Sequence, residues 1–513
     1  MRAERQRMGA ASMFALLAVT WTVPAGADER PREAREFLGP NQELSPQIRE
    51  RSLPRPNRHG SSSTDRLRYW NQVAVDASGL DHTPVLPGED RVFGEQLGPG
   101  RASRAIAIVH IAIFDAVNAI KGGYRSYTGI PRARSDASVD AAIAQAAHDT
   151  LAAVLPSQAP AFDELLEEDL DGVRGSKREI ERGIATGRKA AAAILALRAG
   201  DGSAHAEPLM DLEYVPGPDP GVWRQDPISL IPIALGAHWK SVRPFVLGSS
   251  DQFRVPPPPD MDSPKYAAAY DEVQRVGGDG VATPTERTEE QTHVGIFWAY
   301  DGTPSLCAPP RLYNQILTKV SKEKTKNVVE LARLYALANV AMADAGIAIW
   351  ESKYHYAFWR PVTGIRESDP GTGPTGLGDG NPDTVGDPDY SPLGAPASNL
   401  TGVNFTPPFP AYPSGHAGFG GALFETLRNF YGKDRVKFTF TSDEFNGETV
   451  GNDGEVRPLL PRTFRSFSQA EEENGQSRIY LGIHWSFDKT EGIAQGRRVA
   501  DHVFKKAFQK RRR

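Results

Sequence analysis

Apolar residues recur at helical spacing along most of this 513-residue chain, and in its first half alternation with a period of two is scarce. The first half predicts helices over 65–78, 100–119, 139–155, 162–170 and 178–198. The second half predicts helices over 265–276, 286–300, 327–360, 414–431, 463–483 and 491–509. The longest, 327–360, carries a stripe of leucines at 331, 334 and 337. The predicted fold is therefore all-α, with two helical lobes.

Two long stretches rich in proline show no helical period. Residues 208–262 are expected to join the two lobes across the surface. Residues 367–409 are also rich in glycine and aspartate, and loops of that length usually bind a ligand or cover a site. We expect this second loop to line the entrance of a site, because it directly precedes the predicted helix 414–431. Its aspartates fit no calcium-loop spacing, so calcium there is a weak alternative.

The N-terminus has the pattern of a signal peptide. Three arginines precede an apolar run over 10–23, and Ala25-Gly26-Ala27 follows as a small-residue cleavage site. The predicted organisation is a signal peptide over 1–27, a linker or disordered arm over 28–64, an N-terminal lobe with its connecting loop over 65–262, and a C-terminal lobe over 263–513. The expected location is secreted or periplasmic, although a disordered or anchoring N-terminus is an alternative.

The composition of the chain limits the classes of partner that we expect. Hydrophobic residues make up 39% and charged residues 24%, which is ordinary for a soluble globular protein. The formal charge of −5 gives no reason to expect nucleic acid as a partner. No long apolar stretch follows the N-terminal run, which predicts no membrane span in the mature protein. A single cysteine, Cys307, excludes an intrachain disulfide and a multi-cysteine metal site.

The candidate chemistry centres on Tyr-Pro-Ser-Gly-His-Ala-Gly-Phe-Gly-Gly-Ala at 412–422. Ser414 is placed to cap a helix whose first backbone N–H groups, together with the helix dipole, form an anion site. Gly415 lets the backbone approach an anion, and His416 is placed to exchange a proton with it. The alternative is an ordinary capped helix with a surface histidine.

Two further segments supply cations and a second histidine. Lys353 and Arg360 are seven residues apart, about two helical turns, which predicts that both lie on one helix face. Downstream, Arg478 and His484 are six apart, so a backbone break is expected near Gly482. His484 and Asp488 are spaced to share a face. Together these groups suit a phosphate-like oxyanion.

The order Lys-x6-Arg-Pro, Pro-Ser-Gly-His, then Ser-Arg-x5-His-x3-Asp resembles the vanadium-dependent haloperoxidases and the related acid phosphatases of the type 2 phosphatidic acid phosphatase superfamily. The likeness runs from about residue 66 to about 503. The segments 297–302, 345–350, 358–361 and 407–412 are most similar to the vanadium chloroperoxidases. The resemblance implies two four-helix bundles, with the site in the second.

The same resemblance implies one vanadate per chain, bound to a ring nitrogen of His484. Its oxygens are then held by five groups: Lys353, Arg360, Ser414, the Gly415 N–H and Arg478. His416 moves protons, Lys353 also donates to bound peroxide, and Asp488 and Asp301 support His484 and Arg478 respectively. The substrates implied are hydrogen peroxide, a halide and a small organic acceptor, and the product is hypohalous acid or a halogenated acceptor.

The signature also permits an acid phosphatase, in which His484 is the nucleophile and His416 protonates the leaving group. Trp350 and Phe409 are similar to the apolar halide wall of the chloroperoxidases, which favours halide oxidation. A third class, an inactive binding protein on this fold, requires a replaced signature residue, and none is replaced. The preference between chloride and bromide and the oligomeric state stay open.

Overall fold

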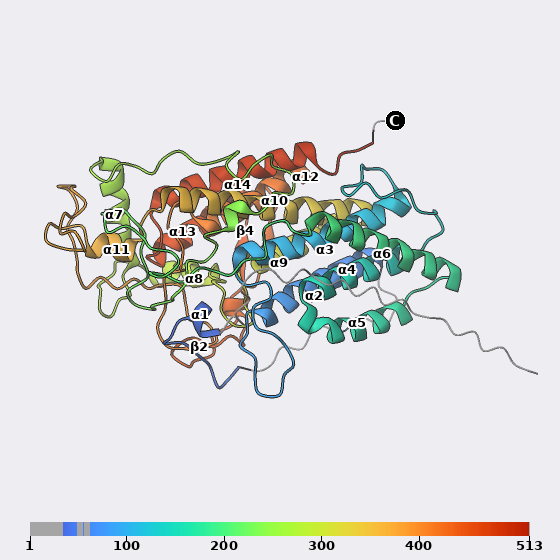
Figure 1. The fold of residues 1–513 in the computed structure, drawn as a ribbon, viewed down its shortest axis with the longest axis horizontal. Helices are drawn as coiled ribbons and strands as arrows, with labels where there is room; N and C mark the ends of the chain where they lie inside the picture. The colour runs from blue at the N-terminus through green and yellow to red at the C-terminus, as the bar shows by residue number, and fades with distance from the viewer. Residues whose placement is uncertain (1–33, 49–54, 56–61, 512–513) are drawn as a thin grey trace, which may run out of the picture. The chain divides into compact units, whose positions relative to one another are not determined.

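The computed structural model describes residues 34–48, 55 and 62–511, and these are predominantly helical, as predicted (Figure 1). The helices are α1 Ala34–Leu38, α2 Ser63–Asp81, α3 Gly98–Lys121, α4 Val139–Val154, α5 Ala159–Asp171, α6 Lys177–Arg198, α7 Pro264–Gly277, α8 Glu289–Phe297, α9 Pro309–Lys324, α10 Val328–Tyr356, α11 Pro361–Arg366, α12 Gly415–Tyr431, α13 Phe467–Tyr480 and α14 Ser486–Lys506. The predicted signal peptide, 1–27, lies outside the described residues, and export stays a prediction.

Two antiparallel strand pairs add a little β-structure. β1 Glu43–Leu44 pairs with β2 Leu400–Thr401, and β3 Phe438–Phe440 pairs with β4 Arg462–Phe464. The first pair joins residues more than 350 positions apart, with Leu44 opposite Leu400. It ties the segment that follows α1 to the long loop before α12. Residues 34–44, within the stretch expected to be a linker or disordered arm, therefore hold regular structure, and Phe37 and Leu38 of α1 are buried.

The core is built around α3 and α10, which pack along each other (Figure 1). α3 also packs on α4 and α6, and α10 packs on α12 and α14. By length and composition α3 and α10 could each cross a membrane, but 94% and 100% of their most apolar windows are buried inside the fold. That burial is typical of core helices. Through α10 the core reaches the C-terminal helices that carry the predicted site motifs.

Besides α1, two helices were not predicted, α9 and α11, and one was predicted too long. α9 begins at Pro309-Pro310. Its apolar residues Leu312, Ile316 and Val320 have the helical spacing that could have predicted it. α10 ends at Tyr356 instead of Arg360, because Ala357 takes a left-handed conformation with φ 46° and ψ 39°. α11 then starts at Pro361, where proline is well suited to the first position of a helix.

Candidate functional site

A pocket lies at the N-terminus of α12. Its volume is roughly 660 Å³, which includes space that is open to solvent. Its walls come from both halves of the chain: Phe37, Leu38, Pro99, Ile231, Leu235, Asp301, Gly302, Ala308, Pro309, Trp350, Leu400, Phe405, Pro407, Pro408, Phe409, Gly415, His416, Phe419, Arg478 and His484. Two of the three sequence motifs, Pro-Ser-Gly-His and the segment from Arg478 to His484, therefore meet in this wall, and the third adjoins it through Trp350 and the contact of Arg360 with His484. The loop 367–409 contributes its end to the wall, as predicted.

The α12 N-terminus has the predicted cap. The Ser414 hydroxyl accepts from the Ala417 N–H at 3.4 Å, and Gly415 is the first helical residue. The Ser414 N–H donates to the Asp488 carbonyl at 3.0 Å, which joins the start of α12 to the start of α14. The small residues here let the two helices approach: a Cβ on Gly492 of α14 would lie 2.6 Å from the Ser414 carbonyl oxygen. Packing of α14 thus positions the N-terminus of α12.

Lys353 and Arg360 converge without sharing a helix face, which corrects the prediction. Lys353 is in the last turn of α10, whereas Arg360 caps α11 beyond the left-handed residue Ala357. Both cations lie over the Phe409 ring, with Lys353 Nζ 5.0 Å and Arg360 Cζ 4.9 Å from its centroid. Both are buried, and they donate mainly to backbone carbonyls of residues 407–411 and 483. The loop before α12 thus holds the two cations in place.

Arg478 pairs with Asp301, the contact that the resemblance implied. Its Nη2 donates to Asp301 Oδ1 at 2.6 Å, and both side chains are buried. Arg478 Nε and Nη1 have no partner among the described residues, and neither does Asp301 Oδ2. Leaving buried guanidinium N–H groups unpaired is costly. These two N–H groups therefore mark a place where an anion would be stabilised.

His484 is held by Asp488. His484 Nδ1 lies 2.7 Å from Asp488 Oδ2, which also accepts the Trp485 N–H at 3.1 Å. Arg360 Nη1 is 2.9 Å from the other ring nitrogen, Nε2. Because a guanidinium can only donate, Nε2 carries a lone pair and Nδ1 carries the proton. The helical backbone is interrupted at Gly482, as predicted. The φ of Gly482 is +71°, and a Cβ there would lie 2.4 Å from the Gly277 carbonyl oxygen.

His416 belongs to the first turn of α12. Its Nε2 donates a short hydrogen bond to the carbonyl oxygen of Ala299. Its own carbonyl accepts from the Tyr313 hydroxyl at 2.7 Å and from Asn474 Nδ2 at 2.9 Å. Burial, and next the positive charge of Arg478, lower the pKa of His416 well below its usual value. The ring is therefore neutral and able to accept a proton.

Electrostatics at the site favour an added anion. Burial lowers the pKa of Arg360 to about 9, and burial together with the Arg360 charge lowers the pKa of Lys353 well below its usual value. The same two causes lower the pKa of His484. Burial raises the pKa of Asp488 to about 7, which weakens its ability to balance the cations. The cluster thus holds an excess of hydrogen-bond donors, and an added anion would favour the charged forms of Lys353 and Arg360.

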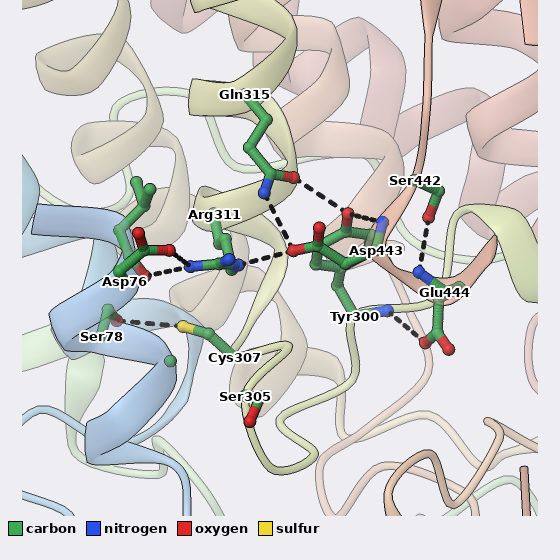
Figure 2. Close-up of polar contacts among 12 residues, drawn as sticks. Asp76, Ser78, Tyr300, Ser305, Cys307, Arg311, Gln315, Ser442, Asp443 and Glu444 are labelled. Atoms are coloured by element: carbon green, nitrogen blue, oxygen red, sulfur yellow. Dashed lines mark hydrogen bonds and ion pairs between the residues drawn. The ribbon is translucent and has the colours of Figure 1, made fainter. Parts of the chain in front are cut away.

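A buried polar network lies behind the Ala299–Asp301 segment (Figure 2). The Glu444 carboxylate accepts the Tyr300 N–H at 3.3 Å and the Ser398 hydroxyl at 2.6 Å. The Tyr300 hydroxyl accepts the Asp443 N–H at 2.6 Å. Asp443 also pairs with Arg311 of α9, at 2.8 Å. Through Tyr300, this network positions the carbonyl that binds His416 and the carboxylate that binds Arg478.

The wall beside the cations combines Trp350 and Phe409, the two residues predicted for a halide pocket. Their ring centroids are 4.9 Å apart with the planes tilted by 59°. The Trp350 indole N–H donates to the Leu235 carbonyl at 3.0 Å, so the joining loop 208–262 fixes the wall. Sequence reasoning missed Leu235 and Phe37 as wall residues, because nothing local in the sequence links either residue to the site motifs.

Two other polar residues of the core, His110 and Asp115, do not line the pocket. His110 of α3 bonds to Asn71 at 2.8 Å, and burial lowers its pKa to about 3. Asp115 accepts backbone N–H groups of Tyr127 and Thr128. Within the described ranges, no group of three or more His, Cys, Asp and Glu side chains has the arrangement of a metal site.

Comparison with known proteins agrees with this geometry. Residues 333–513 match the family model described as the VCPO second helical-bundle domain. Vanadium chloroperoxidase of Curvularia inaequalis is 30% identical over 526 aligned positions, which cover 85% of this chain and 81% of that protein.

Two solved structures share the fold. The crystal structure of the first bacterial vanadium-dependent iodoperoxidase has a TM-score of 0.67 at 24% identity and covers 87% of this chain and 98% of its own. The holo-type bacterial vanadium-dependent chloroperoxidase has a TM-score of 0.59 at 16% identity, covering 89% and 98%. At these identities the structures show the fold alone, and the curated relative shows the family. With the signature residues gathered at one helix N-terminus, this chain belongs to the vanadium haloperoxidase family.

Proposed function

We propose that this protein oxidises chloride and bromide with hydrogen peroxide to hypohalous acid, which halogenates small organic acceptors. The observation that carries the proposal is the pair of buried, unpartnered Arg478 N–H groups beside Lys353 and Arg360 at the N-terminus of α12. Unpaired donors and excess positive charge fit a tetrahedral oxyanion such as vanadate.

The residues that would hold one vanadate are Lys353, Arg360, Arg478, the Ser414 hydroxyl, the Gly415 N–H and, through Nε2, His484. When bound, vanadate(V) supplies Lewis-acid activation of hydrogen peroxide without a change of its own oxidation state. Asp488 keeps the His484 proton on Nδ1, so Nε2 keeps a lone pair, which accepts from Arg360 Nη1 in this structure and would bind vanadate once Arg360 turned to a vanadate oxygen. The low pKa of His484 keeps the ring neutral, as a ligand requires.

His416 is assigned the proton transfers. Its neutral ring lies at the first turn of α12, in the same pocket wall as His484 and Arg478. It can take a proton from hydrogen peroxide as the peroxide enters the site, and it can return that proton to the oxygen atom that leaves. The Ala299 carbonyl orients the ring, and the Arg478 charge keeps its pKa low.

Halide preference is assigned to Trp350 and Phe409. Their rings exclude water beside Lys353, whose Nζ is 5.8 Å and 5.0 Å from the two centroids. A dry wall strengthens the attraction between that cation and an anion. Chloride is smaller than bromide and can approach that cation more closely, so the stronger attraction offsets its larger desolvation cost, and bromide is oxidised as well because it loses electrons more easily.

The test is peroxide-dependent chlorination and bromination of monochlorodimedone, with and without orthovanadate, beside hydrolysis of p-nitrophenyl phosphate. We expect vanadate-dependent halogenation that is lost in His484→Ala and retained in His293→Ala, a histidine outside the pocket. Turnover of bromide alone contradicts the chloride assignment. Phosphate-ester hydrolysis without halogenation would instead establish the phosphatase reading of the same anion site.

A further inference from the structure

Most of the pocket wall is apolar. Its polar side chains are Asp301, His416, Arg478 and His484, which all belong to the anion site described above. The remaining wall is made of Phe37, Leu38, Pro99, Ile231, Leu235, Ala308, Pro309, Leu400, Phe405, Pro407 and Pro408, with Trp350, Phe409 and Phe419 nearer the cations. A halide and hydrogen peroxide need only a few atoms of space. A mostly apolar pocket with a few convergent polar groups is instead typical of a site for a small organic molecule.

Phe37 and Leu38 bring α1 to this wall. The Phe37 ring touches the backbone of Gly302, since a Cβ built on that glycine would lie 3.0 Å from the ring. Gly302 directly follows Asp301, the partner of Arg478. The β1–β2 pairing fixes the chain after α1 against Leu400, another wall residue. An apolar side chain is thereby placed close to the anion site.

Leu235 fixes another part of the wall. Its N–H donates to the Pro408 carbonyl at 2.9 Å. Its carbonyl accepts the Trp350 indole N–H at 3.0 Å and the Tyr354 hydroxyl at 2.9 Å. Backbone hydrogen bonds therefore join this segment to α10 and to the loop before α12. The wall is preformed, which reduces the ordering cost of binding a ligand.

We propose that the apolar part of this pocket binds the organic acceptor, as a neutral aromatic molecule of one or two rings, against Phe37, Leu38, Ile231 and Leu235. The inference rests on the proposed function, because the acceptor is halogenated there by the hypohalous acid formed at the anion site. A ring carbon forms a bond to halogen while the halogen–oxygen bond breaks. The released hydroxide takes the proton displaced from the ring, so one acceptor and one hypohalous acid yield one halogenated acceptor and one water.

A competition between two acceptors tests the proposal in the vanadate-loaded, full-length protein. 2-Naphthol is the neutral aromatic acceptor, and 3-hydroxyphenyltrimethylammonium is a phenol whose permanent charge disfavours an apolar wall. The measured quantity is the ratio of the two brominated products, compared with the ratio that reagent hypobromous acid gives. This ratio does not depend on how fast the enzyme produces oxidant. We expect the enzyme to favour 2-naphthol by about tenfold over the reagent, the size of discrimination that apolar pockets reach.

Substitutions locate the subsite. Phe37→Ala removes one wall, and Leu38→Phe fills the space beside it, so both should bring the product ratio to within about twofold of the reagent. Phe93→Ala is the matched control: Phe93 is as buried as Phe37 and packs edge-on against it at 6.4 Å, but it does not line the pocket. This variant should keep the wild-type ratio.

A reagent-like ratio in the wild-type protein overturns the proposal, because halogenation then occurs in free solution. If the wild-type protein is selective and both Phe37→Ala and Leu38→Phe keep its product ratio, the assigned wall is wrong. Equilibrium dialysis of 2-naphthol, without peroxide, separates failure of the subsite from failure of the proposed function. Without any halogenation, saturable 2-naphthol binding that Phe37→Ala weakens supports the aromatic site, and its absence rejects it.

Discussion

Arg311 and Arg478 are both buried guanidinium groups, with 2% and 1% of their surface exposed, but their surroundings differ. Arg311 donates to two carboxylates, Asp76 at 2.7 Å and Asp443 at 2.8 Å, and to the Val75 carbonyl at 2.6 Å (Figure 2). Burial disfavours the Arg311 cation, but the charges of Asp443 and Asp76 outweigh burial and raise its pKa. This cation is fully compensated by the protein.

Arg478 has one carboxylate partner, Asp301, and two N–H groups without any partner among the described residues. Two more buried cations, Lys353 and Arg360, lie in the same cluster, and burial lowers the pKa of both. The contrast shows that burial of a cation alone does not identify a binding site. A site is indicated where the protein leaves the donors and the charge uncompensated.

The largest expected effect is on stability, at the compensated cation. Arg311→Met leaves the Asp76 and Asp443 carboxylates without their partner, and breaking a buried pair in this way costs about 3–5 kcal/mol. Urea unfolding of the vanadate-free protein measures it. Arg478→Met should cost less than half as much, because it leaves one carboxyl group instead of two, and burial already raises the pKa of Asp301, so that this carboxyl can take up a proton. Equal losses for the two variants would contradict the comparison.

The next effect is on activity, at the uncompensated cation. Arg478→Met removes donors aimed at the anion site, and loss of one such donor typically lowers the rate about 10²–10³-fold. Monochlorodimedone bromination at saturating orthovanadate measures the loss. Arg478→Lys keeps the charge but not the planar fork, so it should recover only part of the rate. Full activity of Arg478→Met would remove Arg478 from the proposed site.

Binding of the anion should also stabilise the fold. At orthovanadate concentrations about 100 times the dissociation constant, the free energy of unfolding should rise by about 2.7 kcal/mol, because only the folded protein assembles the site. Thermal unfolding with and without orthovanadate measures the rise, with phosphate as a second oxyanion. At the same orthovanadate concentration, the rise should shrink in Arg478→Met, which binds the anion more weakly, and persist in His293→Ala. An unchanged melting temperature in the wild type would argue against an anion site.

The smallest expected effect is on the number of protons that the protein takes up when the anion binds. The pKa of Lys353 is low in the anion-free protein because of burial and the Arg360 charge, and a bound anion raises it. At a pH between the pKa of Lys353 in the anion-free protein and its pKa in the anion-bound protein, Lys353 takes up as much as about one proton when the anion binds. This contribution to the affinity for the anion falls as pH rises. Calorimetry in buffers of different ionisation enthalpy measures the uptake. Lys353→Met should take up less than the wild type, and equal uptake would assign the proton elsewhere.

Local patterns predicted much of the site. The Ser414 cap, the chain break at Gly482 and the contact between His484 and Asp488 each depend on residues within a few positions, so their chemistry is visible in the sequence. The prediction that Lys353 and Arg360 share a helix face was wrong. The left-handed residue Ala357 ends α10 early, and alanine has no marked preference for that conformation that a sequence could reveal.

The sequence by itself determined that this chain is helical and which residue types carry its chemistry, because helical periodicity and capping act over one or two turns. Only the tertiary structure decided what lies beside them. Arg478 meets Asp301 across 177 positions, and Phe37 reaches the pocket through a strand pair that spans more than 350. Such contacts result from packing of whole elements, and burial, which sets the charge balance at the anion site, follows from the same packing.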